Sequence, residues 1–304
     1  MVARLLAVLL ALSAASFAGI TDDVREALSR NNVSAGEAEL QSYRGRQGVT
    51  PDYVEALSWM ARADLLSHQL DRADNYAKQT ETLSRQLLAK RSLDAEPHLP
   101  IALGAALEVQ AQVLAARGET AQAVALLRRA VETYRNTSIR ARLQKNLNVL
   151  GLAGQPAPPL KVTSYLGPKP VALSQLSGSP VLLFFWAHWC GDCKAEGPII
   201  AQLGSEFGRR GLMLVAPTQL YGYAAQGEDA TPKDELPYVQ RVWQHFYPGL
   251  QGVPVPISKE NFNLYGASTT PTLVLLDRAG RVALYHPGVM PYEDLRAAIE
   301  KVIR

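Results

Sequence analysis

The chain has 304 residues, of which 47% are apolar and 19% are charged, and its formal net charge is +3. This length accommodates two domains with separate hydrophobic cores, and the composition is ordinary for a soluble globular protein. Because the net charge is small and lysine and arginine form no long run, the composition gives no support for nucleic-acid binding.

Residues 1–18 have the pattern of an export signal. Arg4 supplies a positive start, and residues 5–15 are almost entirely apolar or small. Ser16 and Ala18 then place small residues at the minus-three and minus-one positions of a cleavage site. The run is too short for a comfortable membrane span. We expect a cleaved signal peptide and a periplasmic or otherwise exported protein, with an uncleaved anchor or a buried first helix as alternatives.

Residues 19–150 show apolar and small side chains at helical spacing, which predicts an all-α domain. One helix pair is predicted over residues 51–88, with its turn at residues 68–71. A second pair is predicted over residues 101–134, with its turn at residues 117–120. A further helix closes this domain before residue 150.

The two predicted pairs share small residues twelve positions apart. These are Ala61 and Ala73 in the first pair and Ala111 and Ala123 in the second. Small side chains at such points let antiparallel helices approach closely. The second pair, with Gly118 at its turn, resembles a tetratricopeptide unit. A generic antiparallel helical bundle explains the same pattern equally well.

A domain boundary is predicted at residues 151–160, where three prolines and two glycines cannot continue a helix. Residues 161–304 then alternate strand and helix patterns, which predicts an α/β layer fold. The apolar runs 180–187 and 211–216 suit strands that are buried on both faces. The other expected elements are short strands at 161–164 and 171–173, a helix at about 190–209, a helix at 235–246, a short strand at 252–257, a strand pair at 272–276 and 282–285, and a closing helix at 291–303.

The chain has only two cysteines, Cys190 and Cys193, and two residues separate them. A bond between them closes no useful loop, so we expect reactive rather than cross-linking cysteines. A CxxC motif at the first turn of a helix, directly after a buried strand, is a redox arrangement. The unpaired N–H groups and partial positive charge of a helix N-terminus favour the reactive thiolate. We predict that Cys190 is the nucleophile and Cys193 the resolving thiol that attacks the mixed disulfide.

The CxxC motif also occurs in zinc sites, but zinc would need two further ligands. The chain has no other cysteine, and none of its five histidines forms an HxxxH pattern. We therefore expect no metal, and no cofactor other than a redox-active Cys190–Cys193 disulfide.

The stretch FFWAHWCGDCKAEGP, residues 184–198, resembles the thioredoxin superfamily and, within it, the TlpA/ResA-type periplasmic thiol–disulfide oxidoreductases. The resemblance covers about residues 154–304. It implies a thioredoxin-like C-terminal domain, with a central mixed sheet flanked by helices, preceded by the all-α helical-hairpin domain. It also implies a thiol- or disulfide-bearing protein substrate and a membrane-bound thiol electron donor. The helical domain would offer protein contacts or a surface for self-association.

Three further positions match this family. Pro198 fits the proline that kinks the active-site helix, and Thr270-Pro271 fits the cis-proline loop. In the family that loop lies beside the cysteines and binds partner backbone. Glu196 fits an acidic residue to which the family assigns redox tuning and proton transfer. The resemblance therefore implies a catalytic role for Glu196 beside the two cysteines.

The sequence departs from the thioredoxins proper at Phe184, where those proteins carry a buried aspartate. A base serving Cys193 must therefore come from elsewhere, and Glu196 is the best candidate. A carboxyl near the thiols in an apolar setting should have a raised pKa, which suits proton transfer near neutrality. A solvated helix glutamate is the alternative.

The expected substrate contacts are Trp189, Gly191, Asp192, Thr270 and Pro271. The negative charge of Asp192 should oppose the thiolate and make the pair more reducing, which favours a reductase. Asp192 also suits a helix N-terminus for purely structural reasons.

The environments of His188 and Trp186, which precede the CxxC motif, are predicted from their positions in the sequence. His188 as a cation would stabilise the thiolate, but we expect an exposed loop histidine. Trp186 points the opposite way from Trp189 on the strand and is expected in the core. The polar stretch 219–234 exceeds what the minimal fold needs, and it is either a lip for partner contact or a plain surface insertion.

The predicted function is therefore that of an exported thiol–disulfide oxidoreductase, with protein disulfide reduction as the favoured direction. A thiol oxidase or isomerase and a non-enzymatic tetratricopeptide-type scaffold stay open. A thiol peroxidase is disfavoured, because Ala187 stands where a peroxidatic cysteine would need a threonine three residues earlier.

Overall fold

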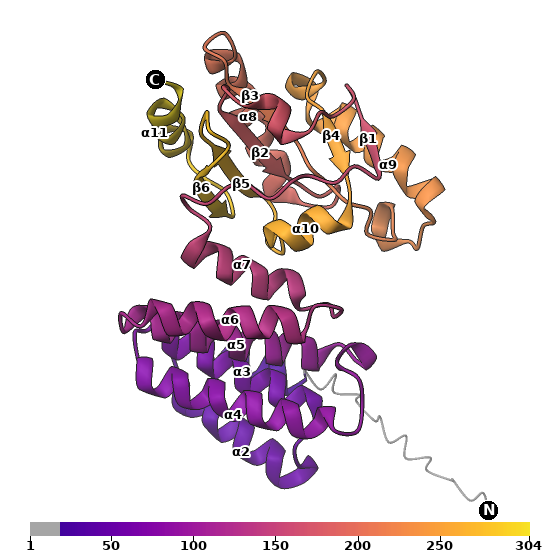
Figure 1. Ribbon diagram of the computed structural model, residues 1–304. Helices are drawn as coiled ribbons and strands as arrows, with labels where there is room; N and C mark the ends of the chain where they lie inside the picture. The colour runs from indigo at the N-terminus through magenta and orange to yellow at the C-terminus, as the bar shows by residue number, and fades with distance from the viewer. Residues whose placement is uncertain (1–18) are drawn as a thin grey trace, which may run out of the picture.

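The structure is a computed structural model that describes residues 19–304, and it consists of a helical half and an α/β half (Figure 1). The predicted signal segment, residues 1–18, lies outside the described residues. The helices of the first half are α1 (Ile20–Ser29), α2 (Val33–Gln47), α3 (Pro51–Leu66), α4 (Leu70–Leu88), α5 (His98–Ala116), α6 (Thr120–Thr133) and α7 (Arg140–Gly151), with the short 3-10 helix η1 (Leu93–Ala95) before α5.

Local capping residues explain where helices of this half begin. The Thr50 side chain accepts a hydrogen bond from the Tyr53 N–H at 3.2 Å, and Pro51 occupies the first position of α3. Asn32 likewise accepts a hydrogen bond from the Ala35 N–H at 3.0 Å where α2 begins. Such caps satisfy backbone donors that the first helical turn leaves unpaired.

Both predicted helix pairs are present, as α3 with α4 and as α5 with α6. Ala61, Ala73, Ala111 and Ala123 are completely buried, because the paired helices pack against each other at these small side chains. Their tetratricopeptide resemblance stays a prediction.

Helix α5 is the central helix of this half and contacts α3, α4, α6 and α7. It is the one described helix that is long and apolar enough to cross a membrane, yet 61% of its apolar window is buried inside the protein. The surrounding helices therefore account for its apolar character, as for the core helix of a globular domain.

The α/β half contains six strands and four α-helices within the described residues. The elements are β1 (Ser164–Leu166), β2 (Val181–Phe185), α8 (Gly191–Gly208), β3 (Met213–Val215), α9 (Pro232–Phe246), β4 (Val255–Ile257), α10 (Lys259–Tyr265), β5 (Thr272–Leu276), β6 (Val282–Pro287) and α11 (Tyr292–Ile303), with 3-10 helices η2 (Leu173–Leu176), η3 (Ala225–Gly227) and η4 (Pro248–Leu250). The strands and helices alternate as the sequence predicts.

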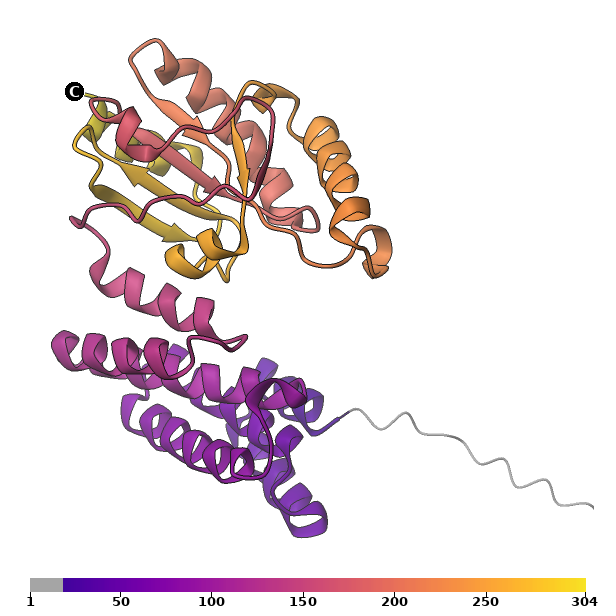
Figure 2. The same ribbon diagram turned by 45° about the vertical axis from the view of Figure 1, so that its right-hand side comes forward.

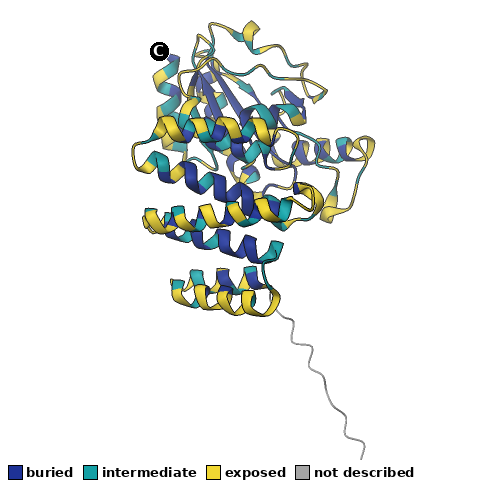
Figure 3. Ribbon diagram, turned by 60° about the horizontal axis from the view of Figure 1, so that its bottom comes forward, coloured by how far each residue is buried: buried dark blue, intermediate teal, exposed yellow. Residues whose placement is uncertain are grey.

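The main sheet is mixed and has the order β3-β2-β5-β6, with β2 and β3 parallel and the other neighbours antiparallel. Every residue of β2 and β5 is buried (Figure 3), because helices pack on both faces. Phe207 of α8 and Ile299 of α11 contribute to the core on one face, and Phe262 and Tyr265 of α10 to the core on the other. The apolar run 180–187 is thus a doubly covered central strand, as predicted.

The prediction of short strands at residues 161–164 and 171–173 is largely wrong. Strand β1 begins only at Ser164 and pairs with β4 in a separate two-stranded sheet. Residues 171–173 form no strand, because Pro168 and Pro170 remove backbone donors just before them. The Gln175 side chain instead accepts a hydrogen bond from the Ala172 N–H at 3.1 Å, where η2 begins.

Helix α7 joins the two halves, because it packs on α5 and α6 on one side and on α10 on the other (Figures 1 and 2). The Arg140 Nη2 atom of α7 lies 3.3 Å from the Glu260 Oε1 atom of α10. Gly266 at the end of α10 comes so close to α7 that an added Cβ would overlap the backbone nitrogen of Lys145. The two halves therefore meet in direct backbone-to-backbone packing.

Candidate active site

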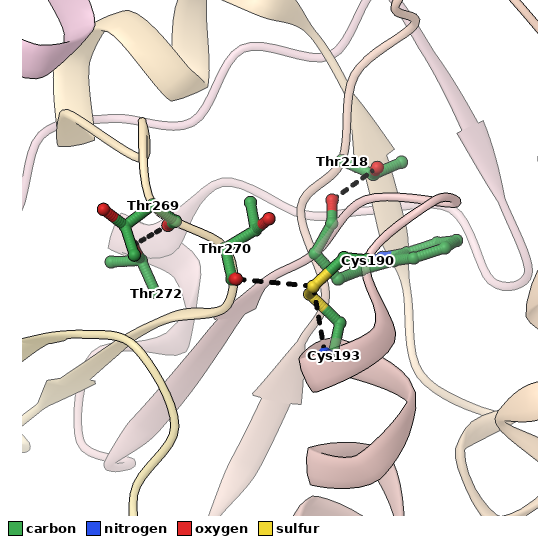
Figure 4. Close-up of a disulfide and its surroundings, with 7 residues drawn as sticks. Cys190, Cys193, Thr218, Thr269, Thr270 and Thr272 are labelled. Atoms are coloured by element: carbon green, nitrogen blue, oxygen red, sulfur yellow. Dashed lines mark hydrogen bonds between the residues drawn. A yellow bond between two sulfur atoms is a disulfide. The ribbon is translucent and has the colours of Figure 1, made fainter. Parts of the chain in front are cut away.

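The two cysteines lie at the N-terminus of α8 and form a disulfide (Figure 4). Cys190 is the N-cap residue of α8, and its Sγ atom accepts a hydrogen bond from the Cys193 N–H at 3.0 Å. Both cysteines are buried, whereas the preceding Trp189 is 50% exposed. This position gives a reduced Cys190 the N–H groups and partial positive charge that stabilise a thiolate.

The loop before β5 faces the disulfide. The carbonyl oxygen of Thr270 lies 3.3 Å from Cys190 Sγ, and the Thr270–Pro271 peptide bond is cis. The Thr272 hydroxyl donates a hydrogen bond to the Thr269 carbonyl oxygen at 2.6 Å, which holds the loop in shape (Figure 4). The structure thus brings Thr270 and Pro271 to the cysteines, where the sequence predicted them.

Glu196 lies one helical turn beyond Cys193 on α8 and is 2% exposed. Burial raises the pKa of the Glu196 carboxyl, and a hydrogen bond from the Met290 N–H to Oε1, at 3.3 Å, opposes that rise together with His286. The direction of this change is the one expected for the Glu196 pKa. The alternative of a solvated helix glutamate is wrong, because the side chain is buried. The carboxyl can therefore hold a proton at a higher pH than an exposed glutamate.

The core positions beside the motif follow the sequence pattern. Phe184 is buried with its ring edge against Tyr247 at 6.0 Å, so the site contains no carboxylate at that position. Trp186 is also buried, and its indole N–H donates a hydrogen bond to the Ala216 carbonyl oxygen at 3.1 Å. Gly191 and Asp192 are exposed in the first turn of α8, next to Trp189.

The expectation that His188 is an exposed loop histidine is wrong, because this side chain is only 1% exposed. The edges of Tyr221, Tyr223 and Tyr238 surround its ring, with centroid distances between 5.2 and 5.5 Å. Its Nε2 atom lies 3.4 Å from Glu235 Oε1. Burial lowers the pKa of His188, while Glu235 acts in the opposite direction.

The polar stretch 219–234 folds over His188 and is fastened by Glu235, which is completely buried. The Glu235 carboxylate accepts hydrogen bonds from the backbone N–H groups of Tyr221, at 2.6 Å, and Gly222, at 2.8 Å. The Tyr221 ring in turn meets the Trp189 ring at 5.6 Å. Sequence reasoning missed this link, although three tyrosines and a glutamate within twenty residues were a signal for a buried polar cluster.

Comparison with known proteins shows what this half of the chain is similar to. The AhpC/TSA family model matches residues 153–219. The chain is 28% identical over 151 residues to the thiol-disulfide oxidoreductase ResA of Bacillus thuringiensis, which covers 49% of this chain and 78% of that protein. It is 27% identical over 148 residues to the thioredoxin-like protein YneN of Bacillus subtilis, with 48% and 78% covered.

A solved structure from Chlorobium tepidum, described as a DsbE thiol:disulfide interchange protein, is 29% identical. It covers 50% of this chain and 98% of its own chain, with a TM-score of 0.39. The sequence relatives match the half of the chain that contains the CxxC pair. The C-terminal half of this chain is therefore similar to the ResA-type thiol–disulfide oxidoreductases, and it contains a CxxC pair at disulfide distance.

Proposed function

We propose that the protein is an exported disulfide reductase that acts on protein disulfides through Cys190 and Cys193. The supporting observation is the position of Cys190 Sγ, which lies at the N-terminus of α8 and 3.3 Å from the Thr270 carbonyl oxygen. The half-exposed Trp189 beside it offers apolar surface to a partner. A thiolate formed there is stabilised by the helix and adjoins groups that a polypeptide can contact.

In the proposed reaction, the Cys190 thiolate attacks one sulfur of the substrate disulfide. A mixed disulfide forms, and the second substrate sulfur leaves as a thiolate that takes up a proton. Cys193 then gives up its proton and attacks Cys190 Sγ. This step releases the first substrate sulfur, which is protonated, and leaves Cys190 and Cys193 as a disulfide. Two electrons have passed to the substrate, and a membrane-bound thiol donor would return them.

Glu196 is the proposed acceptor of the Cys193 proton. It follows Cys193 by one turn of α8, and its burial raises the pKa of the carboxyl toward the range that proton transfer needs. Phe184 stands where the thioredoxins proper have an aspartate, so that position offers no carboxylate to accept the proton.

The reducing direction is proposed from Asp192. This side chain is exposed in the first turn of α8, two residues from Cys190, where its negative charge opposes the thiolate. A less stabilised reduced form makes a more reducing pair. An oxidase would be expected to lack such a charge.

The reduction potential of the Cys190–Cys193 pair tests this proposal. The mature protein would be equilibrated in dithiol and glutathione buffers, and its thiols would be trapped and counted by mass. A value near that of thioredoxin, about −270 mV, supports a reductase, whereas a value near that of DsbA, about −120 mV, makes the protein an oxidant. Insulin reduction by a Cys190→Ser variant at the wild-type rate would refute catalysis by this pair.

Export is proposed from the pattern of residues 1–18. The expected mature protein begins after Ala18 and is found outside the cytoplasm. N-terminal sequencing of the protein from fractionated cells checks both points, and an intact Met1 in the cytoplasmic fraction would contradict them.

A further inference from the structure

A cavity of about 670 Å³ lies between the two halves of the protein, beside the active site. Trp189, Tyr221 and Thr270 line it on the α/β half. On the helical half, Arg135 after α6 and Arg140 at the start of α7 are among the residues that line it. The volume falls in the range of 300–1,000 Å³ that is typical of ligand sites.

We propose that this interdomain cleft binds the polypeptide segment around the target cysteine, and that its cationic wall selects segments rich in aspartate and glutamate. The inference rests on the proposed function, because the partner must bring a sulfur to Cys190. It assigns the helical half a part in substrate recognition through residues far from the CxxC motif in sequence.

The charged residues that line the cleft are three cations and one anion: Arg135, Arg140, Lys259 and Asp94. The carboxylate of Asp94 already accepts hydrogen bonds from the backbone N–H and the hydroxyl of Ser138. Within residues 19–304, Lys259 has no ion-pair partner within 4.0 Å. Cations therefore outnumber anions three to one among the lining residues, with Glu132 and Glu260 paired to the two arginines from outside the lining. A lining of this kind attracts acidic partners.

The existing ion pairs of the two arginines leave them available to a ligand. Arg135 pairs with Glu132 at 2.5 Å on the exposed surface of α6, and such surface pairs contribute little. Arg140 pairs with Glu260 through Nη2, while its Nε atom is buried without a hydrogen-bond partner among the described residues.

Two residues that line the cleft, one on each side, have an enclosed polar atom without a hydrogen-bond partner among the described residues. Besides Arg140 Nε, the Thr270 hydroxyl oxygen is buried and has no hydrogen-bond partner within the described part of the chain. Both atoms are themselves enclosed, so a polypeptide in the cleft would pair with them only after the side chains of Arg140 and Thr270 rotate toward it. An extended polypeptide offers both carbonyl acceptors and N–H donors to such groups.

The helical wall of the cleft is held in place. Arg140 begins α7, which packs on α10, and Gly266 brings the two backbones into contact. Lys259 is the first residue of α10. The cations from the two halves are therefore fixed on elements that pack against each other, which lowers the cost of binding a flexible segment.

The test uses peptides whose single cysteine carries a thionitrobenzoate disulfide, flanked by acidic, neutral or basic residues. Attack by the reduced protein on the peptide sulfur releases coloured thionitrobenzoate and leaves the peptide on Cys190. We expect the second-order rate constant to be about tenfold higher for the acidic than for the basic peptide, with the difference shrinking at high salt.

An Arg135→Glu/Lys259→Glu double variant should reverse this order. The matched control is Arg129→Glu, an exposed position of α6 that does not line the cleft, and it should keep the wild-type order. Equal rates for all three peptides, or an order that the double variant leaves unchanged, would overturn the inference. Wild-type protein that releases no thionitrobenzoate from any peptide would instead refute the proposed function.

A second measurement locates the bound peptide directly. A Cys193→Ser variant retains the mixed disulfide, and an acidic peptide with a benzophenone group near its cysteine can then be cross-linked by light. We expect cross-links to residues 135–141 of the helical half, mapped by mass spectrometry. Cross-links confined to the α/β half, or found between two copies of the chain, would contradict the proposed cleft.

Discussion

Glu196 and His188 are two titratable side chains that the fold encloses beside the same disulfide. Burial raises the pKa of Glu196 and lowers the pKa of His188, so in both cases it disfavours the charged form. Each group nevertheless retains one polar contact, the Met290 N–H for Glu196 and Glu235 for His188. Asp192 and Lys194, in the first turn of α8, are the charged side chains closest in sequence to the two cysteines.

Replacement of Glu196 by glutamine should stabilise the oxidised protein above acidic pH. The folded carboxyl keeps its proton to a higher pH than the unfolded one, whose value is near 4.5. Stability is therefore greatest below that value and falls as the pH rises through the raised folded pKa. Glutamine is neutral throughout and its Oε1 atom can still accept from Met290.

We expect the Glu196→Gln variant to have a Tm a few degrees above wild type at pH 8 and no advantage at pH 4, because about 1 kcal/mol corresponds to ~2–4 °C in a domain of this size. Thermal unfolding at both pH values measures this. Glu39→Gln, at an exposed position of α2, is the control and should show no pH-dependent difference. The same gain at pH 4 and pH 8 would mean that burial of the charge is not the cause. Slower release of substrate from the mixed disulfide in Glu196→Gln would separately support its proposed role as a base.

At the scale of elements, the insertion between β3 and α9 is held down by one carboxylate. Glu235 of α9 binds the backbone of Tyr221 and Gly222 and contacts His188, and Tyr221 packs against Trp189. The insertion is therefore continuous with the active-site surface. This contact supports the lip hypothesis for residues 219–234 over a plain surface loop.

A Glu235→Ala variant should lose about 2–4 kcal/mol of folding free energy, since it removes two charge-assisted hydrogen bonds to the part-buried N–H groups of Tyr221 and Gly222. Urea unfolding gives this value. Trp189 should also become more exposed to solvent in the folded variant, which shifts its fluorescence emission to longer wavelength. Glu228→Ala, within the same insertion but exposed, is the matched control. Equal stability of the two variants would show that Glu235 does not fasten the insertion.

At the scale of the whole molecule, the predicted linker is not a free tether. Its first residue, Gly151, is the last residue of α7. The Gly154 and Ala157 N–H groups donate hydrogen bonds to the Val282 and Gly280 carbonyl oxygens, at 2.8 and 3.0 Å. Together with the α7–α10 contact, these bonds fix the helical half against the α/β half. The orientation of the two halves is thus part of the fold.

Gly266→Ala tests this packing, with Gly280→Ala as a matched control. Both glycines have a positive φ, +60° and +74°, so alanine costs about 1–2 kcal/mol of backbone strain at either position. Only at Gly266 would the Cβ collide with the α7 backbone, whereas nothing lies within 4 Å at Gly280. We expect a clearly larger loss of folding free energy for Gly266→Ala, and faster proteolysis between the halves. Equal losses would mean that the two halves separate easily.

The sequence predicted those features that depend on local signals. The CxxC pair, Glu196 and the Thr270–Pro271 loop lie in short motifs, and the central strand is a single apolar run. The burial of His188 could not be predicted from its neighbours in sequence, because the tyrosines that enclose its ring, Tyr223 among them, lie far along the chain. The Arg140–Glu260 contact joins residues 120 positions apart, and no local pattern encodes it. Helix α10 was also missed, since its seven residues are too few to show periodicity.

The hydrogen bond from the Cys193 N–H to Cys190 Sγ makes the sulfur of the proposed nucleophile also the cap of α8. A thiolate accepts a hydrogen bond more strongly than a disulfide sulfur, so the start of α8 should tighten when the pair is reduced. The backbone amide of Cys193 would then exchange its hydrogen for deuterium more slowly in the reduced protein than in the oxidised one. Amide exchange at this single residue would therefore report the redox state of the Cys190–Cys193 pair without any added dye.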